Sequence, residues 1–482
     1  TANGSGGITG GAIDINDLEA TPVANAAVNG NSVYSVGADG RGTITIGVPS
    51  NPLTGNISFD FVLQDSSHGL ITGFDNNYSG SGTIDLQASS PTPTGTYAFS
   101  LSGADLSGSN AVPISTVGNF TVSGGSISSG LEDFNVNGAT VYPDLALSGS
   151  LALGPSSTPS TTLTTASTLG TITFDALAID PSHLKLIEMD TTGNMVGDAY
   201  SQQTGATIAD GNLAFTLAGF SPGGVPLAAG GIMMVSGGTI ASSSIEDFNS
   251  NGSQVSAFNA PTLFSGAIAS DPSGRDVITL SGFFGGPTEL AAYPSSAGVL
   301  LLEIDGLGGL AMGAGYSQSS TSFSASEGYG LDLSGVNTSG VTGLSEVEID
   351  DIAEFTADSS GSTVTGVIDE NYQPQGGPNP GIDLSGTYGL PGPNGRGQIS
   401  ATAASGSNST LNGGFDLTFY TVDGTTFPFI ESDADGQTAT GVFVQQNPTA
   451  SAAAAKPASA KAHTLIVTHP VIHPYVLKNR AR

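Results

Sequence analysis

Two short segments of the chain place carboxylate and amide side chains at alternate positions, which is how a calcium-binding loop begins. The alternating residues are Asp133, Asn135 and Asn137 in the first segment and Asp247, Asn249 and Asn251 in the second. Oxygens spaced in this way can point at one ion. Position twelve is Asp144 in the first segment, but in the second it is Phe258, which cannot ligate a metal.

The same residue types also have a structural interpretation. Asp and Asn shape turns between strands, because their side chains bond to nearby backbone groups and tolerate the left-handed conformation. No helical pattern flanks either segment, as it would in a helix–loop–helix calcium site. We therefore favour a turn at both segments, and we keep Ca2+ as the only alternative to having no cofactor.

Carboxylate pairs two residues apart could act as the acid and base of glycoside hydrolysis. The pairs are Glu188 with Asp190, Glu303 with Asp305, and Glu431 with Asp433. A catalytic pair is seldom repeated in successive units of an array, so we interpret these pairs as structural and expect no enzymatic activity.

Four tyrosines could stack on sugar rings if they were exposed. They are Tyr97, Tyr200, Tyr316 and Tyr329. Each alternates with apolar neighbours, which favours positions in a core or at the end of a barrel.

The Asp-x-Asn pattern shows how the chain is divided. It occurs four times at similar spacing, beginning at Asp14, Asp133, Asp247 and Asp369. A lead segment such as residues 95–103, a Gly-Arg turn and a closing segment that ends in Gln recur with it, so the chain is a tandem array. We place the repeats at 1–87, 88–203, 204–319 and 320–447, followed by a tail at 448–482.

Within one repeat the apolar residues alternate with polar or small ones. Tyr97, Phe99 and Leu101 are an example. Period two is typical of half-buried antiparallel strands, and Gly and Asn-Gly clusters mark hairpins between them. We predict an all-β chain of about four antiparallel meander sandwich or barrel-like repeats of about 116 residues, as the repeat spacing indicates.

Composition limits the classes of function. The 482 residues include 41 acidic and 9 basic side chains and no Cys. Five of the basic residues lie in the last 27 positions, so the body before them has a formal charge of −37. Such a body lacks the basic footprint that nucleic acid requires. No apolar run is long enough for a transmembrane helix, and no signal peptide is visible.

The first repeat starts late. Complete copies have two further strands before their Asp-x-Asn, but only 13 residues precede Asp14. A sheet that lacks strands exposes unpaired backbone groups, which natural proteins avoid. The tail is apolar, β-branched and basic, and we predict that Leu465, Val467, Val471 and Tyr475 form an interface there. The simpler alternative is that the sequence has lost its beginning and that the tail serves export or anchoring.

The markers together resemble a group of secreted, uncharacterised tandem-repeat β proteins of acidobacterial type. The resembling features are the segment 95–103, the Glu-Asp-Phe-Asn-x-Asn-Gly segments, the Gly-Arg turns and the Glu-x-Asp closers within 1–447. The resemblance implies an extracellular or cell-surface location and transfers no catalytic residues.

These observations favour a structural function. We expect an extracellular surface protein, the subunit of a fibre or filament in which the tail of one copy completes the first repeat of the next, head to tail. The partners are then other copies of the chain. The alternative is an adhesin or carbohydrate-binding repeat protein, which bound calcium would stabilise.

Overall fold

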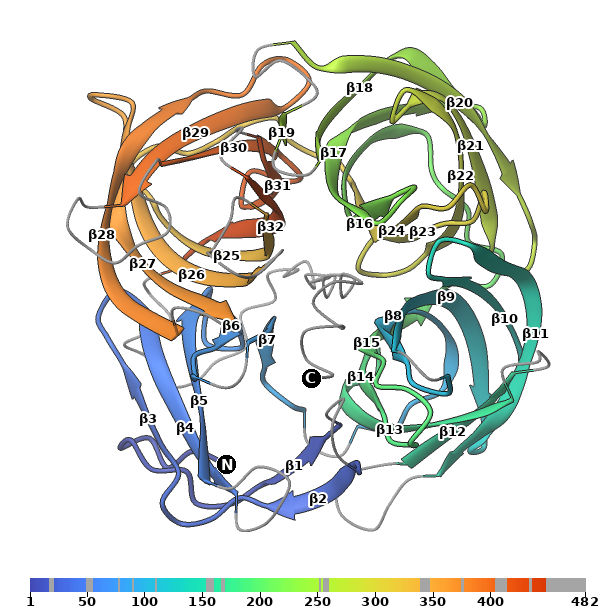
Figure 1. Ribbon diagram of the computed structural model, residues 1–482, viewed down its shortest axis with the longest axis horizontal. Coiled ribbons are helices and arrows are strands. Elements are labelled where there is room, and N and C mark those ends of the chain that lie inside the picture. Colours follow the sequence, from blue (N-terminus) through green and yellow to red (C-terminus); the bar gives the residue numbers. More distant parts are fainter. Residues whose placement is uncertain are drawn as a thin grey trace.

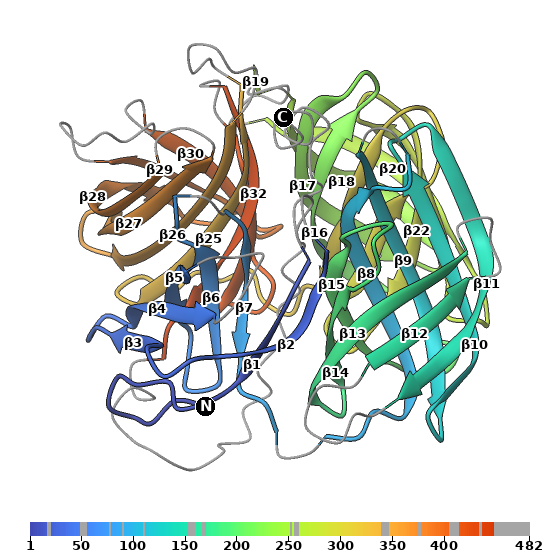
Figure 2. The same cartoon turned by 60° about the horizontal axis from the view of Figure 1, so that its bottom comes forward.

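The chain folds into four β units arranged as a ring, seen in the computed structural model in Figure 1. The structure describes residues 1–16, 21–48, 55–76, 79–88, 91–108, 111–152, 160–165, 170–250, 253–254, 260–338, 347–373, 377–403, 414–432 and 436–447. All regular elements in these ranges are strands, which confirms the all-β prediction. Within the same ranges, no helix is present that could cross a membrane. Figure 2 shows the strands of neighbouring units side by side.

Unit 2 is a closed barrel of eight antiparallel strands. Its strands are β8 (Gly95–Asp105), β9 (Val112–Ser123), β10 (Ser126–Val136), β11 (Thr140–Ala152), β12 (Ser160–Thr165), β13 (Thr171–Asp180), β14 (His183–Glu188) and β15 (Val196–Gln202). The lead strand β8 pairs with both β9 and the closing strand β15, which completes the barrel.

Unit 3 repeats this order. Its strands are β16 (Gly211–Ser221), β17 (Val225–Ser236), β18 (Thr239–Ser250), β19 (Ser253–Gln254), β20 (Thr262–Ser270), β21 (Asp276–Phe283), β22 (Gly286–Pro294), β23 (Val299–Glu303) and β24 (Leu310–Ser317). The pairings of β16 with β17 and β24 and of β17 with β18 close the circuit, and the two-residue β19 is appended to β18.

Unit 4 is a second closed barrel of eight strands. Its strands are β25 (Gly328–Asn337), β26 (Val347–Asp358), β27 (Thr363–Gln373), β28 (Gly377–Gly389), β29 (Arg396–Ala403), β30 (Phe415–Tyr420), β31 (Thr426–Glu431) and β32 (Gln437–Gln445).

Unit 1 is open. Its strands are β1 (Ala12–Ile15), β2 (Val23–Ala27), β3 (Val33–Val36), β4 (Arg41–Val48), β5 (Gly55–Leu63), β6 (His68–Gly73) and β7 (Ser81–Asp85). They form a sheet β3–β7 and a separate pair β1–β2. Among the described residues β7 pairs only with β6, and β1 only with β2, so no barrel is closed.

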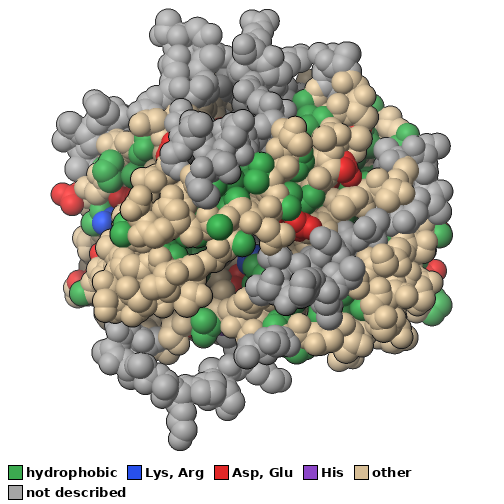
Figure 3. Space-filling view, turned by 90° about the horizontal axis from the view of Figure 1, so that it is seen from below, with side chains coloured by type: hydrophobic (Ala, Val, Ile, Leu, Met, Phe, Trp, Pro, Cys, Tyr) green, Lys and Arg blue, Asp and Glu red, His purple; other side chains and the backbone are tan. Residues whose placement is uncertain are grey.

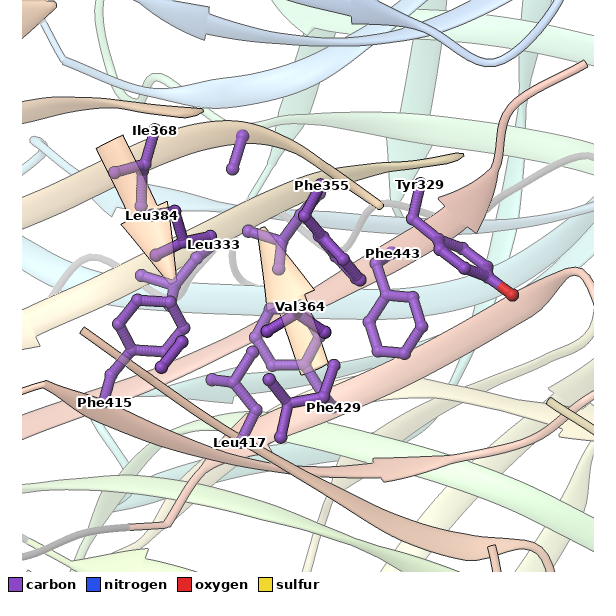
Figure 4. Close-up of a cluster of buried hydrophobic side chains, with 14 of the residues drawn as sticks. Tyr329, Leu333, Phe355, Val364, Ile368, Leu384, Phe415, Leu417, Phe429 and Phe443 are labelled. Atoms are coloured by element: carbon purple, nitrogen blue, oxygen red, sulfur yellow. The ribbon is translucent and has the colours of Figure 1, made fainter. Parts of the chain in front are cut away.

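Each closed barrel is filled by the inward side chains of its own strands. Figure 4 shows this interior in unit 4, where Tyr329, Phe355 and Phe443 come from three different strands and point toward one another. Phe323, which precedes β25, stacks on Tyr329 with ring centroids 5.1 Å apart and closes one end of this core. Alternation of inward apolar and outward residues along each strand is what the period-two sequence pattern encodes.

A second apolar layer lies between the barrels. One cluster contains Ala98 and Val117 of unit 2, Tyr293 and Leu300 of unit 3, and Tyr420 of unit 4. Outward positions that would face water in a free barrel are therefore buried against the next unit. On the face seen from the side of units 1 and 2, few charged side chains are visible among the described residues (Figure 3).

Four glutamates are buried within units 2 and 3. They are Glu132, Glu188, Glu246 and Glu303. Glu132 and Glu246 lie two residues before the inward Phe134 and Phe248 and share their faces. Burial raises the pKa of Glu188, Glu246 and Glu303 to about 8 and that of Glu132 well above its ordinary value.

These glutamates predict a protein that is more stable in mild acid than in mild base. Because their pKa values are raised on folding, the folded chain holds more protons than the unfolded chain between about pH 4.5 and pH 8. Their stabilising contribution is thus complete below about pH 4.5 and is lost as the pH rises through about 8. The melting temperature should fall from about pH 5 to about pH 9.

The matched variant is Glu246→Gln, which mimics the neutral carboxyl at every pH. It should melt above the parent at about pH 9 and should reduce the pH dependence. A melting temperature that rises with pH over this range, or a Gln variant with an unchanged slope, would contradict the assignment.

Candidate functional site

The recurring Asp-x-Asn segments lie where one unit meets the next. In all four units the Asn side chain donates from Nδ2 to two backbone carbonyls of the following unit. The donors and acceptors are Asn16 to Glu188 and Gly193, Asn135 to Glu303 and Gly309, Asn249 to Glu431 and Gln437, and Asn371 to Gly73 and Asp75. The last set joins unit 4 to unit 1, so the contacts run around the whole ring.

The aspartate of the motif binds an arginine of the following unit. Both oxygens of Asp133 accept from Arg275, at 2.6 and 2.8 Å, and Tyr293 donates its hydroxyl to the same carboxylate at 2.6 Å. Such a bidentate pair, with its hydroxyl donor, satisfies a carboxylate that has no exposed surface. The hydrogen bonds to Asp133 raise the pKa of Arg275 above its usual range.

The next interface repeats this arrangement. Asp247 accepts from Arg396 at 2.7 and 2.8 Å and from the Tyr420 hydroxyl at 2.8 Å. At the closure of the ring Asp369 faces Arg41 more loosely, with a shortest separation of 3.3 Å.

The glutamine that ends each closing segment also crosses to the next unit. Gln202 donates to the carbonyls of Gly274 and Pro294, each within 2.9 Å. The other copies donate to Ala178 from Gln87, to Asn394 and Thr421 from Gln318, and to Asp39 and Leu63 from Gln446. Where the receiving unit is unit 1, 3 or 4, an acceptor carbonyl lies in or next to the Gly-Arg turn of that unit. Two of the recurring sequence markers therefore meet at one contact.

The structure places Asp133 and Asn135 inside β10, and Asp247 and Asn249 inside β18, rather than in turns. The turn begins only at Asn137, which has a positive φ of 54°. Gly138 comes next in the chain. Its backbone lies so close to Gly308 of unit 3 that a Cβ atom on residue 138 would collide with the Gly308 carbonyl oxygen. Asn251 lies outside the described residues.

The contacts of the Asp133 and Asn135 side chains favour a structural role over a calcium site. The Asp133 carboxylate points at a guanidinium, and the Asn135 amide nitrogen points at two carbonyls. The described residues include no group of three or more His, Cys, Asp or Glu side chains arranged to hold a metal. The arginine thus supplies the positive charge that an ion would bring. No signal in one segment alone reveals this, but the joint recurrence of Asp-x-Asn and Gly-Arg could have suggested a pair.

The interface between units 1 and 2 is built differently. Unit 2 has no arginine, and its single basic residue is Lys185. Lys185 binds Asp85 of β7 at 2.9 Å and Asp198 at 3.5 Å. Asp14, the copy of Asp133, accepts the Asn25 backbone N–H, and its pKa is raised by burial and by the nearby Asp175 carboxylate.

The other sequence-based candidates fall into two groups. All four tyrosines are buried: Tyr97 and Tyr329 lie in barrel cores as expected, whereas Tyr200 and Tyr316 lie in the apolar layer between units, which corrects their core or barrel-end assignment. Leu465, Val467, Val471 and Tyr475 lie outside the described residues, so their interface assignment stays a prediction.

The ion pairs predict a large penalty for removing one partner. Asp133→Ala leaves Arg275 enclosed without its counter-charge, which should lower stability by about 3–5 kcal/mol. Asp14→Ala is the matched control, because no arginine among the described residues is paired with Asp14, and it should cost much less. Differential scanning calorimetry would compare the two variants, and equal losses would contradict an arginine-specific role for Asp133.

The same geometry predicts that calcium has no effect on stability. Millimolar Ca2+ or excess chelator should leave the melting temperature unchanged, because a ligand stabilises only a state that it binds. A rise in melting temperature with Ca2+ that Asp133→Asn and Asp247→Asn abolish would restore the calcium assignment.

No family model matches the chain, and no curated protein sequence matches it. Among solved structures, the chain is similar to transferrin binding protein B of Neisseria meningitidis serogroup B, at 10% identity and a TM-score of 0.21, over 82% of this chain and 87% of that one. It is also similar to a mutant of the transferrin binding protein B of Haemophilus parasuis, at 9% identity and a TM-score of 0.18, over 79% of this chain and 83% of that one. At these TM-scores the likeness carries no inference about this chain.

Proposed function

We propose that the protein is a non-enzymatic structural component of the cell exterior, a subunit that joins its copies into a surface fibre by strand donation. The observation that carries the proposal is the open unit 1, in which β7 and β1 each present an edge without a pairing strand in the described part of the chain. An edge of this kind accepts an added strand through backbone hydrogen bonds.

The width of the opening supports donation of more than one strand. β4, which begins at Arg41, corresponds to β29, which begins at Arg396, and β1 carries Asp14 as β27 carries Asp369. Among the described residues, unit 1 therefore has counterparts of β27 to β32 and none of β25 and β26. Two donated strands would close it.

The charge distribution supports the tail as the donor. Residues 456–482 contain five basic and no acidic residues, whereas the body is strongly acidic. Complementary charge accelerates encounter and orients the partners. Because the contact joins one end of a chain to a different surface of the next, repeated use of it produces an open filament.

Removal of residues 461–482 tests this function. The full chain should form filaments visible by negative-stain electron microscopy, and the truncated chain should not, because it lacks the donor strands. A charge-only control, Lys478→Ser with Arg480→Ser and Arg482→Ser, should assemble more slowly but still assemble. Filaments of the truncated chain equal to those of the full chain, or none from the full chain, would overturn the proposal.

A further inference from the structure

The opening in unit 1 leaves an apolar interior partly uncovered. Ile44, Phe59, Ile71 and Ile84 face this interior and are each half-buried. Their counterparts in unit 4 are Ile399, Leu417, Phe429 and Phe443, which are buried to 3% exposure or less. The difference follows from the two absent strands, since the remaining strands are equivalent.

The same two strands are also absent from the interface between units 1 and 2. At the other three interfaces the first strands of one unit pack on the last strands of the next, as β9 packs on β22 and β23. In the described part of the chain this strand-on-strand packing has no counterpart between units 1 and 2.

The face of unit 2 that should receive such strands is only partly covered. On unit 3 this face consists of Ala291, Tyr293, Leu300 and Leu302, all without exposed surface. The corresponding positions on unit 2 hold Asp175, Leu177, Lys185 and Ile187, and both Leu177 and Ile187 are half-buried. An occupant of the opening would therefore be sandwiched between an apolar interior and a face that is part apolar and part charged.

The path of the chain indicates where that occupant comes from. After its closing glutamine, unit 1 leaves toward unit 2 with a hydrogen bond from the Ala88 N–H to the Ile179 carbonyl, 2.7 Å, and enters unit 2 as β8. Unit 3 leaves toward unit 4 with the equivalent bond from Ser319 to Val422, also 2.7 Å, and enters it as β25.

Unit 4 leaves by the same bond, but toward unit 1. The N–H of Asn447 donates to the Gln64 carbonyl at 2.9 Å. The chain then continues for 35 residues. The 14 residues up to Lys461 can span up to about 50 Å, so the tail can reach the opening beside β7.

We infer that residues 461–478 form the missing two strands of unit 1 of the same chain, and so close both the barrel and the ring. In this arrangement residues 464–468 would pair with β7 in the place of a lead strand and residues 471–477 would pair with β1, with His469 and Pro470 at the turn. Leu465 and Val467 then share one face, toward the interior, and Ile466 faces unit 2. The basic end of the tail meets the acidic Asp14 and Asp175 side.

This inference rests on the proposed function and adds a way in which assembly of the fibre is regulated. The isolated chain is closed on itself, and a fibre forms when tails exchange between copies through the same interface. Such an exchange is a domain swap, which adds no new type of contact.

Disulfide trapping tests the inference in the full chain, which has no Cys of its own. Ile84→Cys on the interior face of β7 is combined with Leu465→Cys or Val467→Cys, and in the control with Ile466→Cys. Strand pairing brings the Cα atoms of facing residues to about 4.4–6.8 Å, the range that a disulfide requires. The monomer and the assembled fractions are separated by size exclusion, and each is oxidised and run on non-reducing gels.

The expected result is an intramolecular disulfide in most of the monomer with Leu465→Cys or Val467→Cys, and little with Ile466→Cys. Mass spectrometry after proteolysis would identify the linked peptides. Disulfides found only between chains would overturn closure within one chain but leave the proposed fibre intact. Intramolecular disulfides in a chain that never forms filaments would overturn the fibre but leave the closure. No disulfide with any pair would overturn both.

Discussion

The ring depends on one constraint, namely that backbone carbonyls buried between two barrels must find hydrogen-bond donors. The chain between each unit's last two strands turns carbonyls toward the preceding unit, and a buried carbonyl without a donor is strongly unfavourable. One asparagine side chain satisfies two of these carbonyls at each interface, as Asn135 does for Glu303 and Gly309. An amide has two N–H donors on one nitrogen, so Asn suits this task and Asp does not.

The aspartate two residues before this asparagine needs a different kind of partner, because its side chain is a buried carboxylate. A buried carboxylate is costly unless it is paired and hydrogen-bonded, and the net gain from such a pair is small. Its effect is on specificity. A barrel docked with the wrong rotation would leave Asp247 and Arg396 both buried and unpaired, whereas the apolar contacts around Tyr420 tolerate small shifts. The apolar layer therefore supplies adhesion, and the polar pairs fix the angle between units.

These two roles explain what could be predicted from the sequence. Alternation of apolar residues along a strand is a local property, so the all-β fold and the approximate number of repeats followed from segments such as 95–103. The partners of the motif could not follow in the same way, because Asp133 and Arg275 are separated by 142 positions. A recurring Asp-x-Asn has the same composition whether it lies in a turn or at the outward positions of a strand, and only the docking of barrels distinguishes the two. The Gly-Arg turns were visible as repeat markers, but a marker becomes a partner only when the barrels lie side by side.

Closure of the ring has a consequence for unit 1. Three interfaces are formed by the first strands of one unit lying on the last strands of the next, and a ring of four units requires a fourth such interface. In the described part of the chain, unit 1 supplies six of the eight strand positions of a barrel, and Asn447 lies beside that unit, so a fourth interface of the same kind needs strands from outside the described part. The polar contacts there also differ from those at the other interfaces, since Lys185 pairs with Asp85 at the edge of the opening and no arginine among the described residues pairs with Asp14. In the proposed fibre the ring would open at the joint between units 1 and 2, because strand exchange there changes the fewest contacts elsewhere.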